Sequence, residues 1–266
     1  MSLSTILVTH PKILNFTWTP PQTLGSSPTF LILSILTYLT LTLLLPRLPL
    51  PTLPPTLLKP ITALHSATLS LLSLLMAAGC SLSLLTQPDP PRLAVCFPPD
   101  TPPSGPLFFW AHVFYLSKLL ELVDTLLIIL NKSASRLTFL HVYHHATVLV
   151  MCYLWLSTSQ SLFPIALVTN SLVHVVMYAY YFCCAVGVRP RWKRLVTDFQ
   201  IVQFVFSFVV SGWMLYEHFF GGGCSGFSGW CFNAVFNASL LALFLDFHGK
   251  SYDKKKRRSG EKDKRS

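Results

Sequence analysis

The chain has few charged residues. Of its 266 residues only 11% are Asp, Glu, Lys or Arg and 52% are hydrophobic, whereas soluble domains carry about 25% charged residues. The first 27 residues lack the continuous apolar stretch of a cleavable signal peptide. We find no internal repeat and no second domain. These absences favour a single membrane-embedded domain whose first span acts as the targeting signal.

What the chain does contain is long apolar runs. Runs of the length that crosses a bilayer, about 20 residues, recur along it, with most of the 20 prolines between them. We therefore expect an all-α integral membrane protein with seven transmembrane helices. The expected spans are residues 28–46, 61–86, 106–130, 138–157, 161–184, 196–219 and 230–247. The membrane domain would be 28–247, between an N-terminal segment, 1–27, and a basic tail, 248–266.

The basic residues predict the orientation. Alternate loops carry most of the Lys and Arg, and the tail from Lys250 alone holds nine of the twenty. Because cytosolic loops are enriched in these residues, we expect a lumenal N-terminus and a cytosolic tail. Such a tail attracts anionic lipid headgroups, and we expect no nucleic-acid partner. Lys262 and Lys264 resemble the dilysine signal of endoplasmic reticulum membrane proteins, which predicts that location.

Three of the seven cysteines fall in or beside the predicted lumenal loops, where disulfides persist. We expect Cys96 to pair with Cys231, with Cys224 as the alternative partner. The sequence alone does not decide between the two pairings.

Four predicted spans carry polar groups that lipid does not tolerate. In the third, Lys118, Glu121 and Asp124 follow one another at three-residue spacing, with Thr125 beside them. In the fourth, the box His141-Val-Tyr-His144-His145 places three imidazoles on one helical face. Ionisable groups within a membrane usually mark a functional site. A structural ion-pair relay that locks helices together is the alternative for the third span.

The fifth and sixth spans add further polar stripes. Asn170, His174, Tyr178 and Tyr181 share one face of the fifth. Gln200 and Gln203 lie near the start of the sixth, where hydrogen bonding between helices is an equally good explanation. With the predicted orientation, all four helices bring these groups to one layer of the membrane, which extends from the cytosolic half to the midplane. The convergence favours a reactive chamber that opens to the cytosol.

Together these motifs resemble the ELO family of very-long-chain fatty acid elongases. The resemblance lies in four motifs, in the family's order and spacing: Lys118/Glu121/Asp124/Thr125, His141-Val-Tyr-His144-His145, Asn170/His174/Met177/Tyr178/Tyr180/Tyr181 and Thr197/Gln200/Gln203. The proline-rich loops and short chain are similar to plant members of the family. The fold implied is a barrel of six helices, made of two inverted three-helix units around an acyl tunnel, with a seventh helix outside.

The activity implied by this resemblance is the condensation of a long-chain acyl-CoA with malonyl-CoA. The products are CO2, CoA and a 3-oxoacyl-CoA two carbons longer. Both CoA esters are substrates, and we expect no cofactor and no metal. The implied partners are membrane lipid and the reductases and dehydratase of the elongation cycle, and a homodimer is compatible with the resemblance.

The resemblance also suggests roles for individual residues. It implies that His144 is the nucleophile and His174 its partner, and His141 and His145 would position the reacting groups. The expected substrate-binding residues are Lys118, Glu121, Asp124, Asn170, Tyr178, Tyr181, Gln200 and Gln203, with Arg189 and Lys193 attracting CoA phosphates. Those two cations are equally explained by the positive-inside rule.

Two other functions are compatible with parts of the pattern. Membrane di-iron desaturases and hydroxylases also use a box of the form HxxHH. They need several such boxes, and this chain has one, so with His174, Glu121 and Asp124 it could hold at most one metal. A seven-span receptor or transporter fits the topology but not the four motifs.

Overall fold

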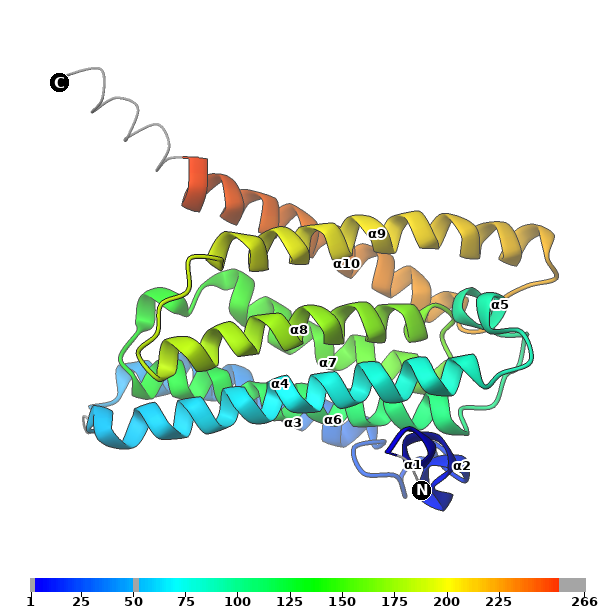
Figure 1. The fold of residues 1–266 in the computed structure, drawn as a ribbon, viewed down its shortest axis with the longest axis horizontal. Coiled ribbons are helices and arrows are strands. Elements are labelled where there is room, and N and C mark those ends of the chain that lie inside the picture. Colours follow the sequence, from blue (N-terminus) through cyan, green and yellow to red (C-terminus); the bar gives the residue numbers. More distant parts are fainter. Residues whose placement is uncertain (1–2, 50–52, 254–266) are drawn as a thin grey trace.

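The protein is a bundle of long helices (Figure 1). The computed structural model describes residues 3–49 and 53–253, and in these ranges it has no β-strand beyond one isolated bridge, Thr17 with Ser104. The long helices are α3 (Pro28–Leu44), α4 (Pro55–Leu85), α6 (Pro106–Leu130), α7 (Phe139–Ser157), α8 (Phe163–Ala185), α9 (Lys193–Phe220) and α10 (Phe227–His248). Every predicted span is thus a helix. Lys262 and Lys264 lie outside the described residues.

Short elements connect the long helices. They are α1 (Leu3–Thr9), α2 (Pro11–Leu14), α5 (Pro90–Val95) and the single turns η1 (Leu45–Arg47), η2 (Ala134–Arg136) and η3 (Gly249–Asp253). Prolines explain several helix starts, because Pro28, Pro55, Pro106 and Pro164 stand in first turns. A first-turn amide has no partner within the helix, so proline costs nothing there.

Six of the long helices are apolar and long enough to cross a membrane. The seventh, α6, contains Lys118, Glu121 and Asp124 and packs against α3, α4, α7 and α8. Leucines remain exposed on outward faces, among them Leu33 on α3 and Leu64 and Leu71 on α4. The protein is a multi-pass membrane protein whose charged helix is surrounded by apolar ones.

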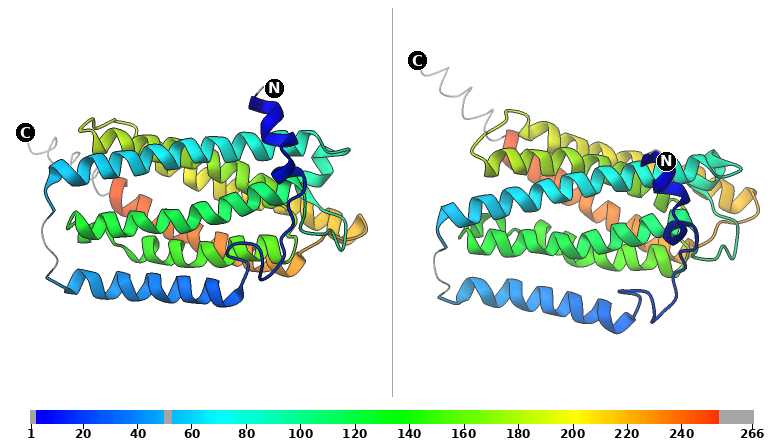
Figure 2. Two further views of the ribbon diagram at one scale, coloured as in Figure 1. Left: turned by 90° about the horizontal axis from the view of Figure 1, so that it is seen from below. Right: turned by 60° about the horizontal axis from the view of Figure 1, so that its bottom comes forward.

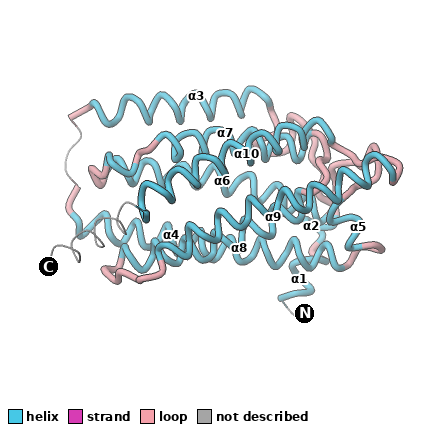
Figure 3. Tube along the Cα trace, turned by 90° about the horizontal axis from the view of Figure 1, so that it is seen from above, coloured by secondary structure: helices cyan, strands magenta, loops and turns pink. Residues whose placement is uncertain are grey.

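The long helices run side by side, and α3 lies along one side of the bundle (Figures 2 and 3). It contacts α7 and α6, whereas α4 packs closely along α8, and α10 contacts both α7 and α9. At Gly79 of α4 an added Cβ would collide with the indole of Trp110, so glycine permits the close approach of α4 and α6. These contacts bring α6, α7, α8 and α9 around a common interior.

The second span begins earlier than the sequence suggested. The expected start at residue 61 is wrong, since α4 begins at Pro55 and runs through Pro60. His65 therefore lies ten residues into the helix, about 15 Å from its start. It is not a residue of the span's end.

One disulfide ties the loops at one end of the bundle together. Cys96 is bonded to Cys224, and Cys231 is free and exposed, so the expected Cys96–Cys231 pairing is wrong and the alternative partner is correct. Cys231 lies within the first turns of α10, whereas Cys224 belongs to the loop before it. That loop runs beside residue 97, where Ser225 N donates to Phe97 O at 2.9 Å.

Candidate active site

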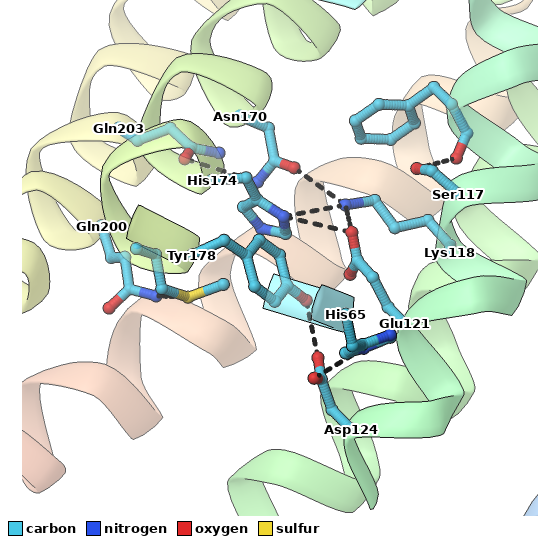
Figure 4. A network of polar contacts seen from close by, with 12 residues as sticks. His65, Ser117, Lys118, Glu121, Asp124, Asn170, His174, Tyr178, Gln200 and Gln203 are labelled. Carbon is cyan, nitrogen blue, oxygen red and sulfur yellow. Dashed lines mark hydrogen bonds and ion pairs between the residues drawn. The ribbon is translucent and has the colours of Figure 1, made fainter. Parts of the chain in front are cut away.

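The centre of the site is a buried ion pair on α6. Lys118 and Glu121 are each 1% exposed, and Lys118 Nζ donates to Glu121 Oε1 at 2.7 Å. From α8, His174 Nδ1 lies 3.1 Å from Glu121 Oε1 and 3.3 Å from Lys118 Nζ (Figure 4). Lys118 Nζ also donates to Asn170 Oδ1 at 3.3 Å. One lysine thus fixes the relative positions of a carboxylate, an imidazole and an amide.

A second network lies one helical turn away on α6. Asp124 Oδ2 accepts from the hydroxyl of Tyr178 at 2.6 Å, and Asp124 Oδ1 lies 3.0 Å from His65 Nε2. The rings of His174 and Tyr178 are in edge contact, with centroids 5.6 Å apart. The two carboxylates of α6 therefore each hold one histidine, and α8 connects the two networks.

The histidine box on α7 meets the same face of α6. Thr125 Oγ1 lies 2.8 Å from His141 Nε2 and 3.2 Å from the hydroxyl of Tyr38 on α3. The rings of His141 and His145 are 4.4 Å apart at their centroids. Because the side chains at i and i+4 share one face, His145 follows His141 into the interior, where it is buried.

His144 faces a different space, a cavity of about 40 Å³. The cavity is bounded by His144 of α7, Asn170 of α8, Gln203 of α9 and Asn233 of α10, with apolar side chains between them. Asn170 Nδ2 donates to Gln203 Oε1 at 3.5 Å. Asn170 thus belongs to both parts of the site. Its side-chain oxygen Oδ1 accepts a hydrogen bond from Lys118, and the residue also lines the cavity beside His144.

Other expected site residues lie at the edge of this network or away from it. Gln200 Nε2 contacts the sulfur of Met177 at 3.6 Å. Tyr181 packs on the ring of Tyr178. Arg189 lies in the loop between α8 and α9, Lys193 begins α9, and both are exposed. Within the described part of the chain, the hydrogen bonds and ion pairs of the buried network do not include them. Of the expected substrate-binding set, these two cations are the ones that the fold keeps apart.

Three residues of the site were not expected from the sequence. His65 lies only four residues after the expected start of its span at residue 61, Tyr38 belongs to no motif, and Asn233 stands in an apolar helix. A lone histidine within an apolar run was the available signal for His65, and the amides of Asn233 and Asn237, four residues apart on one face of α10, were the signal for that helix. Within residues 3–49 and 53–253, no group of three or more His, Cys, Asp or Glu side chains is placed to hold a metal ion.

Comparison with known proteins connects this geometry to a family. The family profile described as ELO: GNS1/SUR4 family matches residues 23–260. The chain is 31% identical to "Fatty acid elongase 3-like" of Arabidopsis thaliana, over 93% of this chain and 91% of that protein. It is 35% identical to "Fatty acid elongase A" of Dictyostelium discoideum, over 72% and 71% of the two chains. It is 38% identical to "Very long chain fatty acid elongase 5" of Mus musculus, over 53% and 48%. With most of its length matched, and with the histidine box and the charged motif of α6 in contact, the chain belongs to the ELO (GNS1/SUR4) family.

Proposed function

We propose that the protein is a 3-oxoacyl-CoA synthase that condenses long-chain acyl-CoA with malonyl-CoA in fatty acid elongation. The observation that carries the proposal is the position of Asn170. It joins the buried Lys118–Glu121–His174 network to the cavity that His144 lines. A nucleophile and a proton-transfer group are thereby coupled through one amide.

His144 is the proposed nucleophile. An imidazole nitrogen attacks the carbonyl carbon of the acyl thioester, the C–S bond breaks, and the acyl group is left on the ring. The proton displaced from His144 passes to the CoA sulfur. No cysteine is among the residues that line this cavity. Apolar side chains of α7 and α10 form part of the lining, and an acyl chain packed against them would limit the access of water to a reactive acyl-imidazole.

His174 is the proposed proton-transfer partner, and its two contacts suit that role. With the proton on Nδ1, the ring donates to Glu121 and Nε2 is a free base. With the proton on Nε2, Nδ1 accepts from Lys118 and Nε2 becomes a donor. The same ion pair therefore stabilises both tautomers, so that His174 can take up a proton and return it without moving its partners.

The second half-reaction forms the carbon–carbon bond. Malonyl-CoA loses CO2, the enolate carbon attacks the acyl carbonyl, and the C–N bond to His144 breaks. His144 then recovers a proton from solvent by way of His174. Asn170 and Gln203, which line the cavity, donate hydrogen bonds to the developing oxyanions. Gln200 lies one turn before Gln203 on α9. His141 holds the box in place through Thr125, and the ring of His145 packs against that of His141.

The membrane arrangement is part of the proposal. Six helices, α4 and α6 to α10, enclose the acyl chain as two inverted three-helix units, and α3 lies outside. The N-terminus is lumenal, and the tail is cytosolic in the endoplasmic reticulum membrane, with Lys262 and Lys264 as a retrieval signal. Arg189 and Lys193 attract the CoA phosphates at the cytosolic mouth. No cofactor takes part, and reductases and a dehydratase act on the product.

The decisive experiment uses purified full-length protein, labelled malonyl-CoA and a saturated acyl-CoA, with and without chelator. We expect labelled 3-oxoacyl-CoA in both samples. Loss of product on chelation would overturn the imidazole mechanism in favour of a metal-dependent one. Intact mass after acyl-CoA alone should show an acyl adduct that His144→Ala abolishes, and Cys231→Ser is the matched control that retains it.

A further inference from the structure

We propose that His65 of α4 is a positioning residue of the reaction centre, on which it acts through Asp124 and Tyr178. This inference rests on the proposed function of His174 and adds to it a residue that lies outside the four motifs. The structure connects His65 to His174 by three successive contacts. They join a different pair of side chains each and lead from α4 by way of α6 to α8 (Figure 4).

Asp124 is the first link, because its two oxygens have different partners. Oδ1 lies 3.0 Å from Nε2 of His65, and Oδ2 accepts from the hydroxyl of Tyr178 at 2.6 Å. Since an ionised carboxylate only accepts hydrogen bonds, Nε2 of His65 is the donor to it. The side chains of His65 and Asp124 are 9% and 18% exposed. The outer torsion of an aspartate has only a weak preference of its own, so these two partners determine how the carboxylate is turned.

Tyr178 is the second link. It is 1% exposed, and its ring meets that of His174 edge-on, with centroids 5.6 Å apart and an angle of 70° between the planes. A buried tyrosine hydroxyl usually has a hydrogen-bond partner, and here the partner is Asp124. The orientation of this carboxylate therefore determines where the tyrosine ring lies against the imidazole.

The imidazole of His174 needs this second restraint. Its contacts with Glu121 and Lys118 are both made by Nδ1, so they fix one corner of the ring and allow rotation about it. The ring of Tyr178 limits that rotation and thereby directs Nε2, the nitrogen that exchanges the proton in the proposed mechanism. A misplacement of about 1 Å caused far from the reacting atoms can slow a reaction by about 100-fold. His65 thus acts on the rate through the direction of this nitrogen.

The test compares purified full-length variants by kcat per folded molecule and by KM for each CoA ester. His65→Leu removes the donor, and we expect kcat to fall by roughly 10- to 100-fold while both KM values stay unchanged. His65→Gln should restore most of the lost rate, because its amide nitrogen extends as far as Nε2 and donates. His65→Asn should not, because its shorter side chain ends near the position of Nδ1. If His65→Leu does not fold, the comparison of the two amides decides.

Ser70 provides the matched control. It also lies on α4, and its hydroxyl donates to Val175 O of α8 at 3.0 Å, a contact between the same two helices that does not involve Asp124. Ser70→Ala should therefore leave kcat unchanged. A fall in kcat as large as that of His65→Leu would show that any loosening of α4 against α8 slows the reaction, and it would overturn the inference.

A double-mutant cycle tests the route through Asp124. Tyr178→Phe removes the hydroxyl that this carboxylate binds, so kcat should fall in this variant as well. Combined with His65→Leu, it should be no slower than the slower single variant, since both changes interrupt one chain of contacts. Multiplicative losses, or an unchanged kcat in His65→Leu, overturn this inference alone. Absence of elongation by the unsubstituted protein overturns the proposed function as well.

Discussion

Replacing Lys118 by methionine should expose how much the buried ion pair contributes. Methionine keeps the unbranched shape of the lysine side chain but removes a cation that contacts Glu121 Oε1 at 2.7 Å, Asn170 Oδ1 at 3.3 Å and His174 Nδ1 at 3.3 Å. Glu121 would then keep one partner, His174, while its other oxygen, Oε2, already has none among the described residues. Removing one member of a buried pair costs on the order of 3–5 kcal/mol, because the remaining charge stays desolvated.

The double variant Lys118→Met/Glu121→Gln separates the buried charge from the loss of contacts. It removes both charges, so we expect it to recover about 1–3 kcal/mol of the loss relative to the single variant. Its elongation rate should stay low, because His174 no longer lies between a cation and a carboxylate. Stability is measured by denaturant unfolding in detergent micelles, and activity by the yield of labelled 3-oxoacyl-CoA.

One outcome would refute this reasoning. If Lys118→Met lowers the free energy of unfolding no more than the double variant does, Glu121 is not left as an uncompensated charge. The buried pair would then not determine the geometry around His174. Arg194→Met, which removes a cation from the exposed pair with Asp198, is the surface control, and its loss should be about 0–1 kcal/mol.

Three further predictions concern stability outside the ion pair. Cys224→Ser should lower the free energy of unfolding by about 2–5 kcal/mol under oxidising conditions, because it removes the disulfide. Cys231→Ser should leave the free energy of unfolding unchanged, since Cys231 is free. Equal effects of the two substitutions in chemical denaturation would argue against this pairing. His65→Phe should cost about 1–3 kcal/mol, because a carboxylate oxygen of α6 loses its partner; hydrogen exchange should show faster opening of α4, and unchanged protection would contradict the contact. Thr125→Val keeps the side-chain shape but removes the hydroxyl that contacts Tyr38 of α3 and His141 of α7, so the free energy of unfolding should fall by about 1–3 kcal/mol. An unaltered midpoint of thermal unfolding would count against these two hydrogen bonds.

The helices were predictable because a bilayer imposes a minimum apolar length that the sequence records directly. The grouping of Lys118, Glu121 and His174 was predictable as well. Three-residue spacing keeps polar groups near one helical face, and that face must turn towards other helices because charged side chains are costly in contact with lipid. Spacing constrains which residues face inward, and the helices then have few ways to bring those faces together.

Contacts that depend on the mutual position of two helices were not predictable. The partner of Asp124 is His65, but Pro60 concealed the true start of α4 and made His65 look like an end residue. The disulfide depended on where α10 begins, because a shift of a few residues decides whether Cys224 or Cys231 lies in the loop. Asn233 belongs to no motif, and the cavity that it lines forms only when four helices pack together.

The order in which the partners of α6 are synthesised bears on how this charged helix enters a membrane. Each charged residue at mid-membrane costs about 2.5–3.5 kcal/mol on insertion scales. Glu121 has Lys118 on its own helix, and Asp124 has His65 on α4, which the ribosome makes first. Glu121 therefore enters the bilayer with a countercharge on its own helix, and Asp124 enters with a hydrogen-bond partner, before α8 exists. His174 and Asn170 arrive later, so the helix that carries the charges does not have to wait for the rest of the site.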